Sequence, residues 1–316
     1  MQNLAYSGGY LDRAGYRRSD PDWAAALLDS PRTRLIPVWR DHCLVSGDPP
    51  APVTVLDASR SRPVRELGTP LFLGMDGDAG LFAVDLSGLD EAQAVEATGA
   101  ERVGDLRAFT GTLGSAEAAA LAYARGLAYW NRSQRFCGAC GTATLSRHAG
   151  HLRVCGNEAC ARLHFPRIEP AVITLVESAG PPQRCLMARH NGSAPDSYAL
   201  LAGFVEIGES LEDAVRREVT EEAGVSLATV NYVASQAWPF PAGLMVGFRA
   251  TAASESVTAD GMEILEARWF TRAELSQRAA AGRPLGRVDS IDRHLLRSWL
   301  DQPETPPATP DGGAGL

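Results

Sequence analysis

Short apolar runs separated by turn residues fill the first 114 residues of the chain. Their pattern predicts strands at 34–39, 43–46, 53–56, 71–74 and 81–84. The segment MDGDAG at 75–80 is typical of a hairpin turn. From 115 to 130 the pattern changes to a helix rich in Ala, Leu and Tyr, with Ser115 as its expected N-cap. We expect a small mixed α/β domain over residues 1–130, with a structural or dimerising role.

Strand and helix patterns alternate after residue 167. Strands are expected at 171–177, 184–188, 230–235, 244–250 and 267–270, with a polar loop at 189–198. Helices are expected at 210–224, 272–280 and 290–300. The last stretch, 301–316, is rich in Pro and Gly and should be disordered.

Composition narrows the class of protein. The 316 residues suffice for two or three domains, and 45% apolar with 22% charged residues is typical of a soluble globular chain. We expect no membrane span, because no apolar run reaches 18 residues, and no signal peptide. A net charge of −8 argues against a broad nucleic-acid surface, though not against a small anion held through metal ions. Six cysteines, four of them clustered, do not indicate a secreted disulfide framework, so cytoplasm is the expected location.

The helix at 210–224 carries an unusual face. Ser210 should begin it in an acidic capping box with Asp213, and Gly224 should end it in the left-handed conformation. At about 100° per residue, one face combines apolar and acidic side chains. These are Leu211, Ala214, Val215, Glu218, Glu221 and Glu222.

Three carboxylates on an inward face repel one another and lose hydration, which is unfavourable unless a cation neutralises them. A hard divalent cation with oxygen ligands would do so. The alternative is a solvated acidic helix end. Such a triplet should instead occupy the opposite face, with Arg216 and Thr220. The pattern therefore favours a divalent metal site.

A second group of metal-ligating residues is Cys137, Cys140, Cys155 and Cys160. The spacing C-x2-C, fourteen residues, then C-x4-C suits one tetrahedral zinc ion. Because cysteine occupies all four positions, this zinc would be structural. The alternatives are two disulfides or unrelated buried thiols. A nearby histidine could also replace one cysteine; the candidates are His148, His151 and His164.

The segment SQAWPFPAG at 235–243 places two prolines around Trp238 and Phe240. Prolines favour an extended backbone, which would present the aromatic faces to a flat ring. A Pro-rich loop packed on the protein body or on a partner subunit would have the same composition. The residues alone leave both interpretations open.

Residues 203–225 resemble the signature of the Nudix hydrolases, G-x5-E-x7-R-E-U-x-E-E-x-G-U, where U is a bulky aliphatic residue. All nine specified positions match: Gly203, Glu209, Arg217, Glu218, Val219, Glu221, Glu222, Gly224 and Val225. The resemblance implies a metal-dependent hydrolase of a nucleoside diphosphate linked to another group.

Further segments resemble the NADH pyrophosphatase subfamily, which places a four-cysteine zinc module before the Nudix box and SQPWPFPxS after it. HFPRIEPAV at 164–172 and EILEARWF at 263–270 also match, so the resemblance covers about residues 115–300. Ala237, Gly243 and the x4 cysteine spacing depart from the subfamily pattern. The first two departures concern affinity and substrate preference more than the reaction.

The resemblance implies roles for the acidic residues. Glu218 and Glu222 would bind Mg²⁺ or Mn²⁺ from the helix, and Glu263 would complete the metal site. Glu221 would be a further ligand or the base that activates water. Arg217 would orient the signature loop through Glu209.

The resemblance also implies a nucleotide site. Its lining would be Gln236, Ala237, Trp238, Pro239, Phe240, Pro241, Ala242 and Gly243. Phe165 and Phe204 would stack on rings, Ala202 would contribute its backbone, and Asp292 would lie near the substrate.

The implied fold is of the mixed α+β class: a Nudix α/β/α sandwich at 169–300, a zinc ribbon at 131–168 and the N-terminal domain at 1–130. The implied reaction is hydrolysis of the diphosphate of NADH or NAD⁺ to AMP and nicotinamide mononucleotide, by a homodimer. Removal of NAD caps from RNA would be a side activity, because the acidic chain offers no basic track for RNA. The alternatives are a hydrolase of ADP-ribose or another nucleotide sugar, and a non-catalytic zinc-containing binding module.

Overall fold

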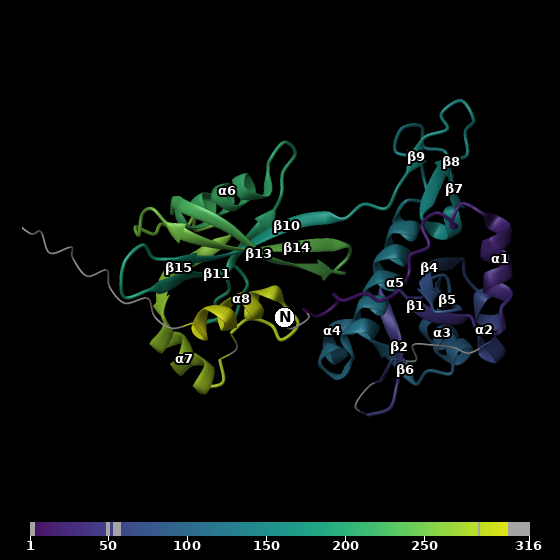
Figure 1. Cartoon of the computed structure of the whole chain (residues 1–316), viewed down its shortest axis with the longest axis horizontal. Coiled ribbons are helices and arrows are strands. Elements are labelled where there is room, and N and C mark those ends of the chain that lie inside the picture. Colours follow the sequence, from purple (N-terminus) through teal and green to yellow (C-terminus); the bar gives the residue numbers. More distant parts are fainter. Residues whose placement is uncertain (1–3, 49–50, 53–57, 284, 303–316) are drawn as a thin grey trace, which may run out of the picture. The chain divides into compact units, whose positions relative to one another are not determined.

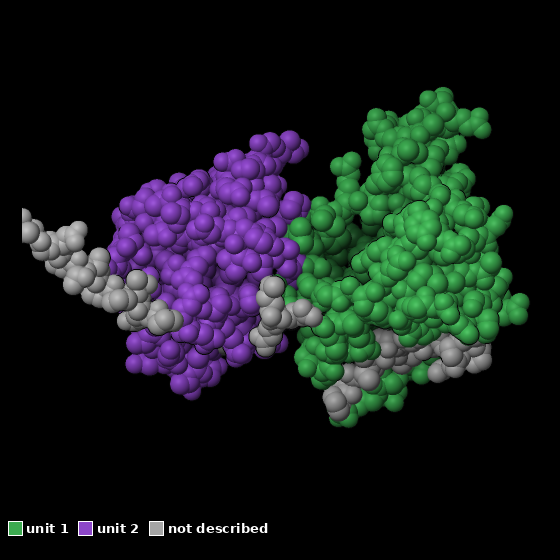
Figure 2. Space-filling view, in the orientation of Figure 1, with its two compact units in different colours: residues 1–169, 237–244 green, residues 170–236, 245–316 purple. Residues whose placement is uncertain are grey.

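The structure is a computed structural model that describes residues 4–48, 51–52, 58–283 and 285–302. Two compact units divide the chain (Figure 1, Figure 2). Unit 1 comprises Met1–Glu169 and Ala237–Leu244, and unit 2 comprises Pro170–Gln236 and Met245–Leu316. The predicted strand at 53–56 and the predicted disordered tail from 303 onward lie outside the described residues.

Unit 1 contains a sheet flanked by helices. Its strands are β1 (Arg34–Trp39), β2 (His42–Ser46), β3 (Ala51–Pro52), β4 (Pro70–Asp76), β5 (Ala79–Asp85) and β6 (Arg102–Gly104). Its helices are α1 (Pro21–Asp29), α2 (Ala58–Arg65), α3 (Glu91–Thr98), α4 (Leu106–Phe109), the 3-10 turn η1 (Thr110–Thr112) and α5 (Ser115–Ser133). The strand order is β3-β2-β1-β5-β4, with β6 beside β2, and β1 runs parallel to β5.

Alternate side chains of this sheet enter two apolar cores, because successive residues of a strand point to opposite faces. On β1, Ile36 and Val38 pack with residues of the long helix α5. Leu35 and Trp39 pack on the other face, with residues of α1 and α3. The sheet of unit 1 is therefore covered on both sides.

The predicted hairpin at MDGDAG is confirmed, since β4 and β5 pair antiparallel through Asp76 and Ala79. The helix predicted from residue 115 is also present as α5. The prediction that Ser115 caps it was wrong: the N-cap is Gly114, which makes no side-chain cap, and Ser115 is already the first helical residue.

Unit 2 is an α/β/α sandwich, as predicted. Its strands are β10 (Glu169–Glu177), β11 (Arg184–His190), β12 (Leu201–Phe204), β13 (Leu227–Trp238), β14 (Gly243–Ala252) and β15 (Ile264–Thr271). Its helices are α6 (Leu211–Ala223), α7 (Arg272–Ala280) and α8 (Ile291–Leu300). The strand order is β13-β14-β10-β11-β15, with β12 paired to β10.

The helices α6 and α8 lie on opposite faces of the unit 2 sheet (Figure 1). On β14, Ala250 and Ala252 pack in the core that contains α6 residues. Gly247, at the opposite parity, lies against Ile291 of α8. None of the helices in the described ranges combines the length and the apolar character that a membrane crossing needs.

Candidate active site and zinc site

Short-range hydrogen bonds fix both ends of helix α6. Ser210 Oγ accepts from Asp213 N at 3.1 Å, and the Asp213 carboxylate accepts from Ser210 N at 3.2 Å. This is the predicted capping box. Gly224 ends the helix with φ of 68°, as predicted. These two caps fix the residues at which α6 begins and ends.

Three metal-ligating side chains meet beside α6: Glu222 of the helix, Glu263 just before β15, and His190 at the end of β11. One ligand atom of each lies within 4.8 Å of the others. Glu222 is 4% exposed, and its Oε2 has no hydrogen-bond partner among the described residues. A buried carboxylate oxygen without a partner is costly. The donor set therefore fits a divalent cation held by carboxylates.

Without a cation, the charged forms of the carboxylates near Glu222 are unfavourable, because the groups are buried and repel one another. Burial, together with the carboxylates of Glu218 and Glu263, raises the pKa of Glu222 to about 8. Burial also raises the pKa of Glu218, against a hydrogen bond from Arg217 that lowers it. A bound cation would favour the charged form of each carboxylate and so oppose both shifts.

We predict that, without added divalent metal, Glu222 makes the protein less stable as the pH rises. Its pKa increases from 4.5 to about 8 on folding, so the folded chain binds more protons between these values and stability falls across that window. Melting temperatures of wild type and Glu222→Gln should therefore diverge from pH 5 to pH 9, the variant becoming the more stable. A constant difference across this range would contradict the prediction. Glu212→Gln, on an exposed position of the same helix, is the control.

Arg217 joins α6 to the loop that precedes it. Its guanidinium donates to Glu209 at 2.6 and 3.0 Å, to Glu218 at 2.8 Å, to Glu221 at 3.1 Å and to Phe204 O at 2.8 Å. The bidentate contact lowers the pKa of Glu209 to about 2. Arg217 therefore contacts both Glu209 in the loop and Glu218 on the helix, as expected if it orients the loop relative to α6.

Glu221 is not part of the buried group. Its side chain is 62% exposed, and the prediction that it faces the protein body was wrong. The buried residues of α6 are Ala214, Val215, Val219, Glu222 and Ala223. Val219 and Ala223 extend the apolar face away from Glu221, so the face that packs on the sheet is centred nearer Glu222 than we predicted.

His190 was not among the predicted site residues, because the polar loop was expected to begin at 189. Strand β11 instead continues to His190. Leu186 and Ala188 of this strand pack in the core beneath α6, and His190 follows with the same period of two. That spacing is the sequence signal that could have identified it.

Gly203 of β12 leaves room for the carboxylate of Glu218, a predicted metal ligand that lies outside the group of His190, Glu222 and Glu263. A Cβ at this position would lie 1.9 Å from Glu218 Oε1. We therefore predict that Gly203→Ala displaces the Glu218 carboxylate and lowers metal-dependent turnover roughly 10²-fold, as small misplacements of reacting groups do. The melting temperature should stay near wild type, because the clash is with the end of a flexible side chain. Gly180→Ala, where an added Cβ meets nothing within 4 Å, is the control; equal turnover in both variants would contradict the prediction.

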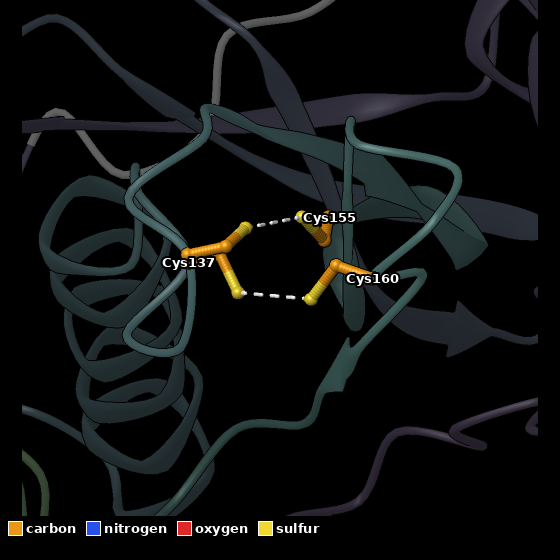
Figure 3. A group of neighbouring side chains, drawn as sticks. Cys137, Cys155 and Cys160 are labelled. Atoms are coloured by element: carbon orange, nitrogen blue, oxygen red, sulfur yellow. Dashed lines mark hydrogen bonds between the residues drawn. The ribbon is translucent and has the colours of Figure 1, made fainter.

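The four predicted zinc ligands come together in unit 1, around a small antiparallel sheet. Its elements are β7 (Thr144–Arg147), η2 (His148–Gly150), β8 (Leu152–Cys155) and β9 (Leu163–His164). The sulfurs of Cys137 and Cys160 lie 3.9 Å apart, and those of Cys140 and Cys155 lie 3.4 Å apart. Figure 3 shows the side chains of Cys137, Cys155 and Cys160 directed toward a common centre. A tetrahedral zinc with bonds of about 2.3 Å holds its sulfurs about 3.8 Å apart, whereas a disulfide measures about 2.0 Å. The four free thiols therefore fit one structural zinc ion, as predicted.

The wide second cysteine pair is accommodated by a turn. Cys160 N and Ala161 N both donate to Asn157 O, at 3.0 and 2.8 Å. The turn takes up the two additional residues and returns Cys160 to the group. Within the described part of the chain, the zinc group is formed without the nearby histidines His148, His151 and His164.

The segment predicted to be extended is so only in part: residues 235–238 continue β13, whereas the four residues between β13 and β14 form a turn in unit 1. Phe240 N donates to Trp238 O at 2.8 Å. The two rings pack edge to face at 5.2 Å, and Tyr6 packs edge-on against both. Arg125 lies over the Phe240 ring at 4.7 Å and donates to Pro241 O at 3.3 Å. Packing on the body of the unit, the second interpretation left open, describes these rings.

A cavity of about 240 Å³ lies beside Trp238 within unit 1. Five of the predicted nucleotide-site residues line it: Ala237, Trp238, Pro239, Ala242 and Gly243. Tyr123 and Trp130 of α5 form another wall, and Arg13 and Arg167 add positive charge. A mostly apolar cavity of this size suits a planar ring.

The other predicted substrate residues are distributed between the units. Phe165 in unit 1 and Phe204 in unit 2 expose 57% and 64% of their surface. The backbone of Ala202 acts on Glu222, because hydrogen bonding from it lowers the pKa of this carboxyl against the burial that raises it.

Gln236 and Asp292, two further predicted substrate residues, are buried in unit 2. Gln236 Nε2 donates to Asp289 O and its Oε1 accepts from Ile291 N, both at 2.7 Å. It thus joins the end of β13 to the start of α8. Burial raises the pKa of Asp292 to about 7.

The sandwich and its glutamate-bearing helix define a Nudix domain, and three family models match the chain. A NUDIX domain covers residues 167–289, and an NADH pyrophosphatase zinc ribbon domain covers 132–165. An NADH pyrophosphatase-like rudimentary NUDIX domain covers 32–130, the region that we predicted to be a mixed α/β domain.

Curated relatives agree with these matches. The NAD-capped RNA hydrolase NudC of Deinococcus radiodurans is 41% identical over 206 residues, which are 65% of this chain and 70% of that one. NudC of Pseudomonas aeruginosa is 41% identical over 180 residues, 57% of this chain and 60% of that one. The human NAD-capped RNA hydrolase NUDT12 is 39% identical over 197 residues, and the match spans 58% of this chain and 42% of NUDT12. The chain belongs to the Nudix hydrolase superfamily, in its NADH pyrophosphatase subfamily.

Proposed function

We propose that the chain hydrolyses the diphosphate of NADH or NAD⁺ to AMP and nicotinamide mononucleotide, with Mg²⁺ or Mn²⁺. The observation that carries this proposal is the buried Glu222 carboxylate, which has an oxygen without a partner beside Glu263. The names of the relatives, NAD-capped RNA hydrolases, support the substrate class.

The divalent cation, when bound, neutralises phosphate oxygens and lowers the pKa of a water for attack on phosphorus. Glu218, Glu222 and Glu263 would hold it. Arg217 would keep Glu218 in place while it fixes the signature loop through Glu209. Glu221, exposed and close to this group, would be an additional ligand or the base that accepts the proton of the water.

The nucleotide would be held by exposed and cavity-lining residues. Phe165 and Phe204 present exposed rings for stacking, and Ala202 contributes its backbone beside the metal group. We assign the cavity beside Trp238 to one ring of the dinucleotide; it is bordered by Ala237, Trp238, Pro239, Ala242 and Gly243.

Product analysis tests the reaction. Incubation with NADH should yield AMP and reduced nicotinamide mononucleotide after addition of Mg²⁺ or Mn²⁺, and no AMP after chelation of these ions. ADP-ribose, assayed in parallel, should have the lower kcat/KM. A higher value for ADP-ribose would make the chain a nucleotide-sugar hydrolase, and metal-independent AMP would overturn the site.

Removal of NAD caps from RNA is the second candidate, favoured by the names of the relatives. A capped RNA presents the same diphosphate with a 3′ extension. We expect a lower kcat/KM for capped RNA than for NADH, because a net charge of −8 disfavours approach of a polyanion. The comparison should use one capped oligonucleotide at several salt concentrations; a higher value for the RNA would make decapping the principal activity.

We also propose that the chain forms a homodimer in the cytoplasm. The cytoplasm is supported by four clustered cysteines that form no disulfide, since reducing compartments keep thiols in this state. Exposed apolar side chains such as Leu145 and Leu163 offer surface to a second copy. Light scattering with size-exclusion chromatography would give the mass, and a monomer at micromolar concentration would contradict the dimer.

A further inference from the structure

His190 adds an imidazole to a group that otherwise consists of carboxylates. We propose that His190 is a ligand of the catalytic metal ion, and that this nitrogen ligand makes the site prefer Mn²⁺ to Mg²⁺. The inference rests on the proposed function, because the ion is the one that the proposed reaction uses.

The fold directs His190 to the metal group in two ways. Strand β11 faces α6 through Leu186 and Ala188, and His190 keeps that orientation. The pairing with β15 then shifts: Arg189 pairs with Glu266, but His190 pairs with Ile264. The ladder therefore skips one residue of β15, and such a bulge changes the direction of neighbouring side chains. It brings the end of β11 beside the residue that precedes Ile264, which is Glu263.

Hydrogen bonds hold the two backbone segments together. Asn191 N donates to Glu263 O at 2.8 Å. The Asp260 carboxylate accepts from Glu263 N at 3.1 Å and from Ile264 N at 2.8 Å. The backbone of the Glu263 segment is therefore fixed against the end of β11. His190 and Glu263 thus lie on supported positions and not on a free loop.

The side chain of His190 is available as a ligand. It is half-buried, and neither ring nitrogen has a hydrogen-bond or ion-pair partner among the residues that the structure describes. Its ligand atom lies within 4.8 Å of those of Glu222 and Glu263. The buried Oε2 of Glu222, also without a described partner, is a second unused donor atom. One ion among these three side chains would use all of them.

The chemistry of the set distinguishes between the two candidate ions. Mg²⁺ binds oxygen ligands and retains several waters. Imidazole instead suits first-row transition metals, and carboxylates suit Mn²⁺ among them. A site with one imidazole and several carboxylates should therefore favour Mn²⁺ over Mg²⁺ more than an all-oxygen site does.

The test measures metal binding directly in the full chain with its zinc retained. Free Mn²⁺ is titrated by electron paramagnetic resonance, and Mg²⁺ affinity is obtained by competition. His190→Gln should lower Mn²⁺ affinity about tenfold or more, as losses in metal sites do, and should change Mg²⁺ affinity much less. His294→Gln, a half-buried histidine of unit 2 outside the group, is the matched control and should bind both ions as wild type does.

Pulsed spectra of bound Mn²⁺ provide a signature that a merely structural role would not change. Coupling to ¹⁴N of imidazole should appear in wild type and in His294→Gln and be absent in His190→Gln. His190→Asp, which supplies oxygen in place of nitrogen, should still bind Mn²⁺ without the ¹⁴N coupling and with a smaller preference over Mg²⁺. The aspartate variant also keeps the test valid if the glutamine variant does not fold.

The possible results distinguish failure of the His190 ligand role from failure of the proposed hydrolase activity. Metal-dependent AMP formation with bound Mn²⁺ that lacks ¹⁴N coupling would overturn the role of His190 and leave the proposed function standing. Equal losses of Mn²⁺ and Mg²⁺ affinity in His190→Gln would also overturn the preference. Absence of any metal-dependent hydrolysis, with Mn²⁺ binding unchanged in Glu222→Gln, would overturn both proposals.

Discussion

Glu222→Gln should keep the fold and lose nearly all metal-dependent turnover. The glutamine has almost the same shape but no negative charge, so it cannot neutralise a cation. Metal-ion stabilisation of the transition state is worth several kcal/mol, which corresponds to roughly 10²–10³-fold in kcat. Because the carboxylate is buried with one oxygen unpartnered, its replacement should not destabilise the metal-free protein at neutral pH. The measurements are kcat for NADH hydrolysis with Mg²⁺ and with Mn²⁺, and the melting temperature.

The control for this variant is Glu212→Gln. Glu212 lies on the exposed face of the same helix, so this change removes one charge from α6 without touching the buried group. Its turnover should remain near that of wild type. Activity of Glu222→Gln within a few-fold of wild type would discard the assignment of the metal site, whereas loss in both variants would indicate a general effect of charge on α6.

Local signals in the sequence predicted much of this site. The capping box of Ser210 and the left-handed Gly224 define α6 within one residue, because both depend on backbone geometry close in the chain. The cysteine spacing likewise predicted a compact zinc group, since metal geometry limits which spacings can converge. The wider spacing between Cys155 and Cys160 is accommodated by the turn at Asn157.

The remaining errors come from contacts that are distant in the chain. The rotation of α6 depends on which side the sheet covers, so Glu221 could not be separated from Glu222 by helical spacing alone. The period of two along β11 could have placed His190 on the face toward α6, but its meeting with Glu263 depends on a shift in strand pairing that the sequence pattern does not show. Gln236 belongs to a family motif but its side chain binds the start of α8, a partner that follows more than fifty residues later.

Cys137→Ser should remove zinc from the chain and unfold the zinc ribbon. Wild type should contain one zinc ion per chain, bound by four thiols that converge within 4.8 Å. Structural zinc sites contribute apparent binding free energies of about 10–16 kcal/mol at neutral pH, so loss of one ligand should exceed what the small three-stranded sheet can replace. The hydroxyl of serine is a much poorer zinc ligand than a thiolate. Zinc content by mass spectrometry and the rate of proteolysis between residues 131 and 168 measure the result.

Cys185→Ser is the matched control, because Cys185 is a buried free thiol of unit 2 that lies outside the zinc group. It should retain one zinc ion and resist cleavage in the ribbon, although burying a hydroxyl in place of the thiol lowers the stability of unit 2. The disulfide alternative gives the opposite pattern in reductant: dithiothreitol would loosen a ribbon held by two disulfides, while chelation at high temperature would loosen one held by zinc. Retention of stoichiometric zinc by Cys137→Ser would show that three cysteines and another ligand suffice, and the all-cysteine site would have to be abandoned.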